Sequence, residues 1–212
     1  QGWGGGFKQS GIIRADDIDE LADMVRAFSY LPPMKGRRIG VVTASGGIGI
    51  MTLDACARHN LQVAELTPET KRRLNAMSPT WYRAGNPLDI WPLIINSTRP
   101  FGETLRAAMT EVLGDPRIDA IVVFAGAWFQ GFKPLITDVM KETADAFPDK
   151  PIAWCPYDGW LFDIHSRDLQ DVLEEAGRAA VFSITDDAVR ALSKLADYSE
   201  FRKVNGKERT RT

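Results

Sequence analysis

Residues 37–49, Arg-Arg-Ile-Gly-Val-Val-Thr-Ala-Ser-Gly-Gly-Ile-Gly, decide the fold of this chain. A short apolar run ends in a hydroxyl and glycine cluster, and a helical pattern follows at once, which predicts a strand, a tight loop and a helix N-terminus. Such a junction gathers unpaired backbone N–H groups at the positive end of a helix dipole, and glycines let an anion approach closely. The stretch therefore predicts phosphate or phosphoryl binding. The alternative is that Gly46, Gly47 and Gly49 only permit a tight turn and close helix–sheet packing.

The composition is that of an ordinary globular protein, with 212 residues, 44% hydrophobic and 25% charged, and a formal net charge of −2. One large domain or two small ones fit this length. The near-neutral charge gives no general attraction to nucleic acids or anionic membranes, so we expect neither as a partner. Cys56 and Cys155 lie far apart in apolar segments, which favours reduced core thiols. Because the sequence shows no membrane span and no signal peptide, we expect a cytoplasmic protein. The first residue is Gln1 and not Met, which suggests an excerpt of a longer polypeptide.

Extended runs and helical patterns alternate along the chain. The expected strands are the apolar runs at 39–43, 62–66, 120–124, 151–155 and 180–182. The expected helices are at 16–30, after 46, at 68–77, 102–113, 133–147 and 165–176, and after 186. This order predicts an α/β fold with a doubly wound, mostly parallel five-stranded sheet. Ligands of such sheets bind at the carboxyl ends of the strands, which places the loops after Thr43, Phe124 and Cys155 on one rim.

Helical spacing also predicts apolar faces on two helices. One face lies in the helix at 16–30 and consists of Ile18, Leu21, Met24, Val25 and Phe28. The other follows the glycine cluster and consists of Ile48, Met51, Thr52, Ala55 and Cys56. Residues 78–99 carry three prolines, two tryptophans and Gly85 and are expected to form a long functional loop. The basic stretch from Arg202 to Thr212 is expected to be a solvated tail or linker.

The glycine cluster departs from known nucleotide-binding loops. It contains no Gly-Lys-Ser/Thr, so the P-loop interpretation fails. The stretch from Gly47 begins like a dinucleotide fingerprint, but Thr52 stands where the third glycine belongs. Glu65, after the second expected strand, would be the carboxylate for a ribose hydroxyl, so a dinucleotide site stays open as an alternative.

Two further turns carry candidate residues. In Gly85-Asn-Pro-Leu-Asp, Asn86 and Asp89 either bond local backbone and pin the loop, or Asp89 contacts a ligand or orients a catalytic group on a neighbouring module. The turn that begins at Gly126 contains three aromatic side chains that either pack in the core or line an acyl or pantetheine pocket: Trp128, Phe129 and Phe132.

Neither histidine is predicted to be catalytic. His59 lies near the end of the helix after the glycine cluster, where a positive side chain suits the helix dipole. His165 follows the fourth expected strand, but Asp163 before it is a plain helix cap. Because the sequence has no Cys/His metal cluster and no nucleophile elbow, we expect no metal site and assign no catalytic residue to this chain.

Three stretches together carry a family resemblance: Phe7-Lys-Gln-Ser-Gly-Ile-Ile-Arg-Ala-Asp-Asp, Ile39-Gly-Val-Val-Thr-Ala-Ser-Gly-Gly-Ile-Gly-Ile-Met and Gly85-Asn-Pro-Leu-Asp. In order and spacing they resemble the NDP-forming acyl-CoA synthetases, relatives of succinyl-CoA ligase and of the ADP-forming acetyl-CoA synthetases. The resemblance extends more weakly to Lys150-Pro-Ile and Leu173-Glu-Glu-Ala-Gly. It implies three parts: the tail of a preceding phosphohistidine ligase domain with a linker helix (1–36), a flavodoxin-like three-layer ligase domain (37–200), and a basic polar tail or linker (201–212).

In that family a phosphohistidine carries a phosphoryl group between an ATP-grasp module and the acyl-CoA site. This chain lacks the family's Ser-His-Thr-Gly motif. The resemblance therefore implies that the active histidine, the CoA-binding domain and the ATP-grasp module lie outside these residues. It assigns binding of the phosphoryl group or phosphohistidine loop to Ser45, Gly46, Gly47 and Gly49, and support of the rim to Asn86, Asp89 and Gly126. The turn from Gly126 to Phe132 departs from the family's pattern.

The leading interpretation is a ligase-domain fragment of an NDP-forming acyl-CoA synthetase, which when whole converts an acid, CoA and NTP to acyl-CoA, NDP and phosphate. CoA and ATP or ADP with Mg²⁺ are implied for the complete enzyme, as are a small carboxylic acid substrate and assembly into an oligomer. One alternative is an acyl-CoA- or nucleotide-sensing domain of a protein acyltransferase. The other is an NAD-type dinucleotide-binding domain.

Overall fold

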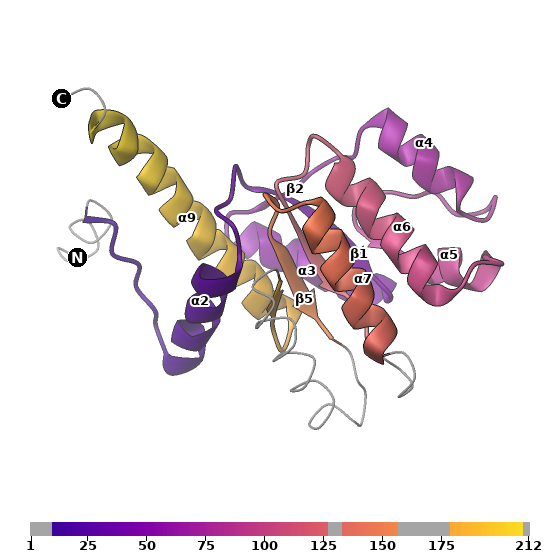
Figure 1. Ribbon diagram of the computed structural model, residues 1–212, viewed down its shortest axis with the longest axis horizontal. Coiled ribbons are helices and arrows are strands. Elements are labelled where there is room, and N and C mark those ends of the chain that lie inside the picture. The colour runs from indigo at the N-terminus through magenta and orange to yellow at the C-terminus, as the bar shows by residue number, and fades with distance from the viewer. Residues whose placement is uncertain (1–9, 127–132, 157–178, 210–212) are drawn as a thin grey trace.

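A parallel β-sheet with helices on both faces forms the centre of the protein, as a computed structural model describes it for residues 10–126, 133–156 and 179–209 (Figure 1). The strands of the described residues are β1 (Arg38–Thr43), β2 (Gln62–Val63), β3 (Leu88–Asp89), β4 (Ala120–Phe124), β5 (Ile152–Cys155) and β6 (Ala180–Val181). Their order is β2-β1-β4-β5-β6, β3 also pairs with β1, and every pair is parallel. The predicted doubly wound α/β fold is confirmed, with a sixth strand that the sequence did not predict.

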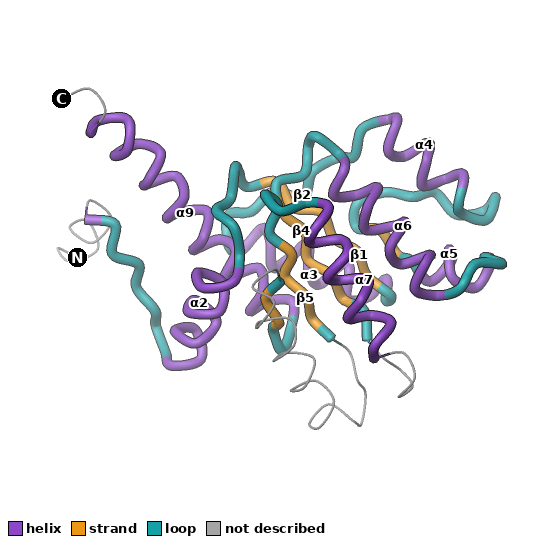
Figure 2. The backbone as a smooth tube through the Cα atoms, in the orientation of Figure 1, coloured by secondary structure: helices purple, strands orange, loops and turns teal. Residues whose placement is uncertain are grey.

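The helices form two layers, one on each face of the sheet (Figures 1 and 2). One layer contains α4 (Pro68–Ala76), α5 (Trp91–Asn96), α6 (Phe101–Gly114) and α7 (Lys133–Ala146). The other contains α2 (Ile18–Tyr30), α3 (Gly46–Arg58) and α9 (Thr185–Arg209). Because side chains of a strand alternate between faces, Ile121 and Val123 of β4 join the first core and Ala120 and Val122 the second. The predicted three-layer sandwich follows from this alternation.

The free edge of β1 is shared by three different partners. β2 pairs only with Arg38 and Ile39, at the start of the strand. At Val41 the backbone N–H donates to the side-chain oxygen of Asn86 instead of to a strand. β3 then pairs with Val42 and Thr43 at the carboxyl end. This explains why β2 stops at Val63 instead of Leu66. The prediction of one long loop at 78–99 was wrong, because this segment contains β3 and α5 as well as loop.

The predicted apolar faces of α2 and α3 are only partly buried. In α2, Met24 is buried and Phe28 packs against the core as predicted, but Ile18, Leu21 and Val25 are exposed, while Glu20 and Asp23 are buried. Helix α2 packs on α9 through the Phe28 ring, which contacts Tyr198, and through ion pairs, which Lys194 makes with Glu20 and Arg190 makes with Asp23. In α3 the buried face consists of Gly49, Thr52, Ala55 and Cys56, and Met51 is exposed.

Helix α9 continues through most of the expected tail. It runs for 25 residues to Arg209, so residues 201–209 are helical, and their assignment as a tail or linker stays a prediction. Lys203 explains part of this difference because its ammonium group donates to the backbone oxygens of Met34 and Lys35, ahead of β1. The division of the chain at 36 and 200 into separate domains stays a prediction.

Candidate functional site

The junction between β1 and α3 is a tight loop held by one hydroxyl. Thr43 Oγ1 accepts a hydrogen bond from Ser45 N at 3.0 Å and donates to Ser45 O at 2.8 Å. Ser45 is the N-cap of α3, but its side chain makes no capping hydrogen bond. The first intrahelical bond of the junction runs from Gly49 N to Ser45 O, so the N–H groups of Gly46, Gly47 and Ile48 have no partner within the helix. Three aligned donors at the positive end of a helix dipole favour an anion.

The three glycines of this junction have different surroundings. Gly47 is exposed, and a Cβ built on it would meet nothing among the described residues closer than Ser45 Oγ at 4.0 Å. Gly49 is buried, and its Cβ would lie 3.2 Å from carbons of both Pro87 and Thr43. None of the three has a positive φ angle. The packing interpretation therefore applies to Gly49, whereas packing does not account for glycine at position 47.

Asp89 brings a carboxylate to the same helix end. A Cβ on Gly46 would lie 3.1 Å from Asp89 Oδ2, and Asp89 Oδ1 accepts a hydrogen bond from Trp91 N at 2.9 Å. The backbone N–H of Asp89 donates to the Tyr82 hydroxyl at 3.1 Å. Burial, opposed by this hydrogen bond, raises the pKa of Tyr82, so the hydroxyl stays neutral. Asp89 Oδ1 is thus held by Trp91 N, and Oδ2 lies beside the first turn of α3.

The side chain of Asn86 bonds to main-chain atoms of β1 and of Ala64. Its Oδ1 accepts from Val41 N at 2.8 Å, and its Nδ2 donates to Ile39 O and Ala64 O, each at 2.8 Å. Both N–H groups of the Asn86 side-chain amide therefore donate to main-chain oxygens. Asn86 holds the 78–99 segment against β1 and so positions Pro87 and Asp89 for their contacts with α3.

The structure places the other candidate residues from the sequence analysis at different positions in the fold. Gly126 is buried just after β4, where Trp154 Nε1 donates to Ala125 O at 2.8 Å. Glu65 is exposed and paired with Lys71 at 2.7 Å; the hydrogen bond from Lys71 lowers the pKa of Glu65. His59 is the C-cap of α3, at the opposite end from Gly46, 3.6 Å from Asp186. Four candidates lie outside the described residues: Trp128, Phe129, Phe132 and His165.

Three contributors to the site were not predicted from sequence. Thr43 shapes the loop, Tyr82 orients Asp89, and Pro87 packs on Gly49. Thr43 carried a signal, since a hydroxyl two residues before Ser45 suits a local hydrogen-bonded turn. The roles of Tyr82 and Pro87 depend on contacts that only the folded chain makes.

Both cysteines are buried and unpaired, as predicted. No group of three His, Cys, Asp or Glu side chains within the described ranges is arranged to hold a metal ion. In the same part of the chain, no helix combines the length and hydropathy that a bilayer crossing requires.

Residues 39–158, which include the β1–α3 junction, Asn86 and Asp89, match the Ligase-CoA domain family. The chain belongs to this family. It is 27% identical over 202 residues to acetate–CoA ligase (ADP-forming) II of Archaeoglobus fulgidus, covering 92% of this chain and 28% of that protein. It is 35% identical over 174 residues to the alpha subunit of acetate–CoA ligase (ADP-forming) II of Pyrococcus furiosus, covering 81% and 36% respectively.

Solved structures show the same fold. PH0766 from Pyrococcus horikoshii OT3 superposes with a TM-score of 0.79 at 25% identity, over 94% of this chain and 44% of that chain. The dinucleotide-forming acetyl-coenzyme A synthetase 1 of Ca. Korarchaeum cryptofilum, in complex with phosphate and ADP, superposes with a TM-score of 0.75 at 23% identity, over 97% and 42%. The chain thus spans less than half the length of each of these relatives.

Proposed function

We propose that the chain is a ligase domain of an NDP-forming acyl-CoA synthetase. The complete enzyme would convert a small carboxylic acid, CoA and NTP to acyl-CoA, NDP and phosphate through a phosphohistidine outside this chain. The uncapped N-terminus of α3 carries the proposal, because Gly46 and Gly47 are exposed and Ser45 makes no capping bond. Membership of the Ligase-CoA family and similarity to ADP-forming acetate–CoA ligases support it.

In this proposal the N–H groups of Gly46, Gly47 and Ile48 donate to oxygens of the transferred phosphoryl group. Preorganised donors of this kind stabilise the charge that develops during transfer. Asp89 would not bind the phosphoryl oxygens, because like charges repel. Its carboxylate instead would accept an N–H of the incoming imidazole and so position the ring. Ser45 shapes the loop, while Asn86 and the buried Gly126 support the rim.

The complete enzyme would need further parts. We propose a CoA-binding domain, a phosphohistidine domain and an ATP-grasp domain or subunit, within an oligomer. The nucleotide would enter as its Mg²⁺ complex and bind on the ATP-grasp part. The chain described here would then contribute binding and orientation, and it would make no thioester by itself.

The test uses the complete enzyme, radiolabelled ATP and CoA with a panel of short and aromatic acids. We expect an acid-labile phosphohistidine and ATP-dependent acyl-CoA. The Gly47→Val variant should reduce turnover by roughly 100-fold or more, because its branched side chain would keep a phosphoryl oxygen away from the backbone N–H groups, and the loss of one such hydrogen bond costs about 3 kcal/mol of transition-state stabilisation. Gly114→Ala is the control, since position 114 ends α6 and a Cβ there would have 4.0 Å to Phe147.

Two results would contradict the proposal. One is near-normal turnover of a well-folded Gly47→Val enzyme. The other is ATP-dependent acyl-CoA formation by the 212-residue chain alone. A complete protein that binds acyl-CoA or nucleotide without turnover would favour the sensing-domain alternative.

A further inference from the structure

Helix α3 begins without the capping bond that α2 and α4 have. Three of the N-cap residues that the structure describes carry a side chain able to cap a helix: Asp17, Ser45 and Thr67. The side chains of Asp17 and Thr67 each accept a hydrogen bond from the N–H three residues further on, at 2.7 and 3.2 Å. The equivalent bond at α3 would run from Ile48 N to the Ser45 hydroxyl, and it is absent. Because serine is among the most favoured N-cap residues, residue type does not explain the difference.

The backbone of Ser45 differs from that of the two residues that do cap. Its ψ angle is 116°, whereas ψ is 152° at Thr67 and −179° at Asp17. The φ angles of Ser45 and Asp17 are nearly equal, at −145° and −146°, so the difference between these two lies in ψ. Rotation about ψ turns the following helix relative to the side chain, and so it moves the Ile48 N–H relative to the Ser45 hydroxyl. At 116° the helix does not use that hydroxyl.

The hydroxyl of Thr43 holds Ser45 in this conformation. It accepts a hydrogen bond from Ser45 N at 3.0 Å and donates one to Ser45 O at 2.8 Å, so it bridges the two ends of that residue. The distance between these ends depends only on the two soft backbone angles of Ser45, which the bridge therefore restrains. Thr43 itself is buried, and its backbone pairs with Asp89 on one side and Phe124 on the other. The end of β1 thus sets the first turn of α3.

We propose that Thr43 is a positioning residue that keeps Ser45 from capping α3. The N–H of Ile48 then stays available to the phosphoryl group, and no bond within the chain has to break before that group binds. Without the Thr43 hydroxyl, Ser45 would turn toward the geometry of the other two caps, and its Oγ would accept from Ile48 N. The cap and the phosphoryl group would compete for one donor. The inference rests on the proposed function, because it concerns the same helix end.

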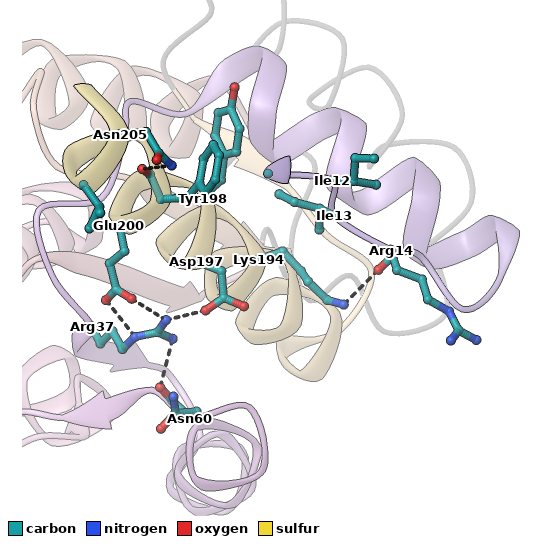
Figure 3. Close-up of a pocket in the computed structure, with 13 residues that line it drawn as sticks. Ile12, Ile13, Arg14, Arg37, Asn60, Lys194, Asp197, Tyr198, Glu200 and Asn205 are labelled. Carbon is teal, nitrogen blue, oxygen red and sulfur yellow. Dashed lines mark hydrogen bonds and ion pairs between the residues drawn. The ribbon is translucent and has the colours of Figure 1, made fainter. Parts of the chain in front are cut away.

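The cavity beside α9 gives the phosphoryl group no equivalent place. It has a volume of about 680 Å³ and lies between residues 11–14 and α9 (Figure 3). Each of the three described cations that line it already contacts a carboxylate: Arg14 contacts Asp16, Arg37 contacts Asp197 and Glu200, and Lys194 contacts Glu20. An anion there would have to displace an ion pair, whereas at α3 it meets N–H groups that have no partner within the helix. The α3 end is the better anion site of the two.

The first experiment is a double-variant cycle in the complete enzyme. Thr43→Val keeps the shape of the side chain and removes its hydroxyl. It should lower kcat by roughly 5- to 30-fold, because the phosphoryl group must now displace one N-cap bond. The KM for ATP should not change, since ATP is proposed to bind on another part of the enzyme. In the Ser45→Ala background the same substitution should cost at most about 2-fold, because no hydroxyl remains to form the cap.

A merely structural role of Thr43 predicts a different result. It would not depend on the Ser45 hydroxyl, so equal losses of kcat in the two backgrounds would overturn the proposal. Thr43→Ser keeps the hydroxyl and removes only the methyl group, and it should retain most of the turnover. A loss as large as that of Thr43→Val would also overturn the proposal.

Thr143→Val is the matched control. Thr143 is likewise buried, and its hydroxyl donates to a main-chain oxygen, Val139 O, at 2.6 Å, but it lies in α7. We expect this variant to keep its turnover. A loss of the same size as in Thr43→Val would attribute the effect to general stability and would overturn the assignment.

Crystal structures of the native and Thr43→Val complete proteins give a readout that needs no turnover. In the variant, Ser45 Oγ should lie about 3 Å from Ile48 N, as in an ordinary hydrogen bond. An uncapped Ser45 in the variant would overturn the proposal. If the cap forms in the variant but the native protein makes no acyl-CoA, the proposed function fails and the effect of Thr43 on Ser45 stands.

Discussion

The carboxylate of Asp89 lies beside Gly46 at the first turn of α3, so close that a Cβ on Gly46 would be 3.1 Å from Asp89 Oδ2. The two residues are brought together by β3, which pairs Asp89 with Thr43 at the carboxyl end of β1. A negative side chain there complements the positive end of the helix dipole. The same carboxylate restricts what else binds at this helix end.

Substitution of Asp89 separates positioning from stability. Asp89→Asn keeps an oxygen for the Trp91 N–H but removes the charge, so we expect a loss of turnover in the complete enzyme that exceeds any change in melting temperature. Glu65→Ala is the matched carboxylate control, because Glu65 is exposed and contacts Lys71. We expect it to leave turnover nearly intact. A large activity loss at Glu65 with none at Asp89 would favour the dinucleotide alternative.

Two of the three glycines of α3, Gly47 and Gly49, should respond in opposite ways to alanine. Gly49→Ala should destabilise the chain by about 1–3 kcal/mol, because its Cβ would press on Pro87 and Thr43. Gly47→Ala should be neutral or stabilising by up to about 0.5 kcal/mol, since alanine favours helix and the site is open. Urea denaturation of both variants measures this difference. Equal destabilisation would show that Gly47 is also a packing residue.

Removal of the Asn86 amide should destabilise the fold strongly. Asn86→Ala removes the hydrogen bonds that its side chain makes with Val41 N and Ala64 O, and leaves Ile39 O with Ala64 N as its donor, which should cost about 3 kcal/mol of unfolding free energy. Asn96→Ala, at an exposed position, is the control and should stay within about 0.5 kcal/mol. A small effect of Asn86→Ala in equilibrium unfolding would mean that β1 finds other partners.

The ion pair of the buried Asp119 with the exposed Arg38 should make stability depend on acid pH. Burial opposes ionisation of Asp119, but hydrogen bonds from the Arg38 side chain and backbone outweigh it, so the pKa of Asp119 lies below its ordinary 3.8. The pair therefore stabilises the fold fully above that ordinary pKa and is lost as pH falls through the lower folded value. Asp119→Asn should be less stable at neutral pH, with a difference that shrinks in acid. A pH-independent difference in urea midpoints would contradict this.

The two thiols should be inert in the folded chain. Burial raises the pKa of Cys56 to about 12 and also raises that of Cys155, so little thiolate forms at neutral pH. A thiol reagent such as Ellman's should react only after denaturant is added. Fast reaction of either cysteine in the native chain would show that its segment opens readily.

The sequence by itself determined the alternation of strands and helices, because local apolar periodicity reports which residues face the sheet. It placed β4 at Ala120–Phe124 and the start of α3 at the glycine cluster, since uninterrupted apolar runs and glycine turns are local signals. The Ligase-CoA resemblance was likewise carried by residues close together in sequence, and the family match confirmed it.

Only the tertiary structure decided which part of each pattern is used. Asn86 replaced a strand on the edge of β1, and ion pairs with α9 placed Glu20 and Asp23 on the buried side of α2. Lys203 bonded backbone ahead of β1, in a stretch whose composition indicated a linker. Each of these outcomes depends on hydrogen bonds or ion pairs between residues distant in sequence. Periodicity and composition cannot predict them, because they report only the neighbours of a residue along the chain.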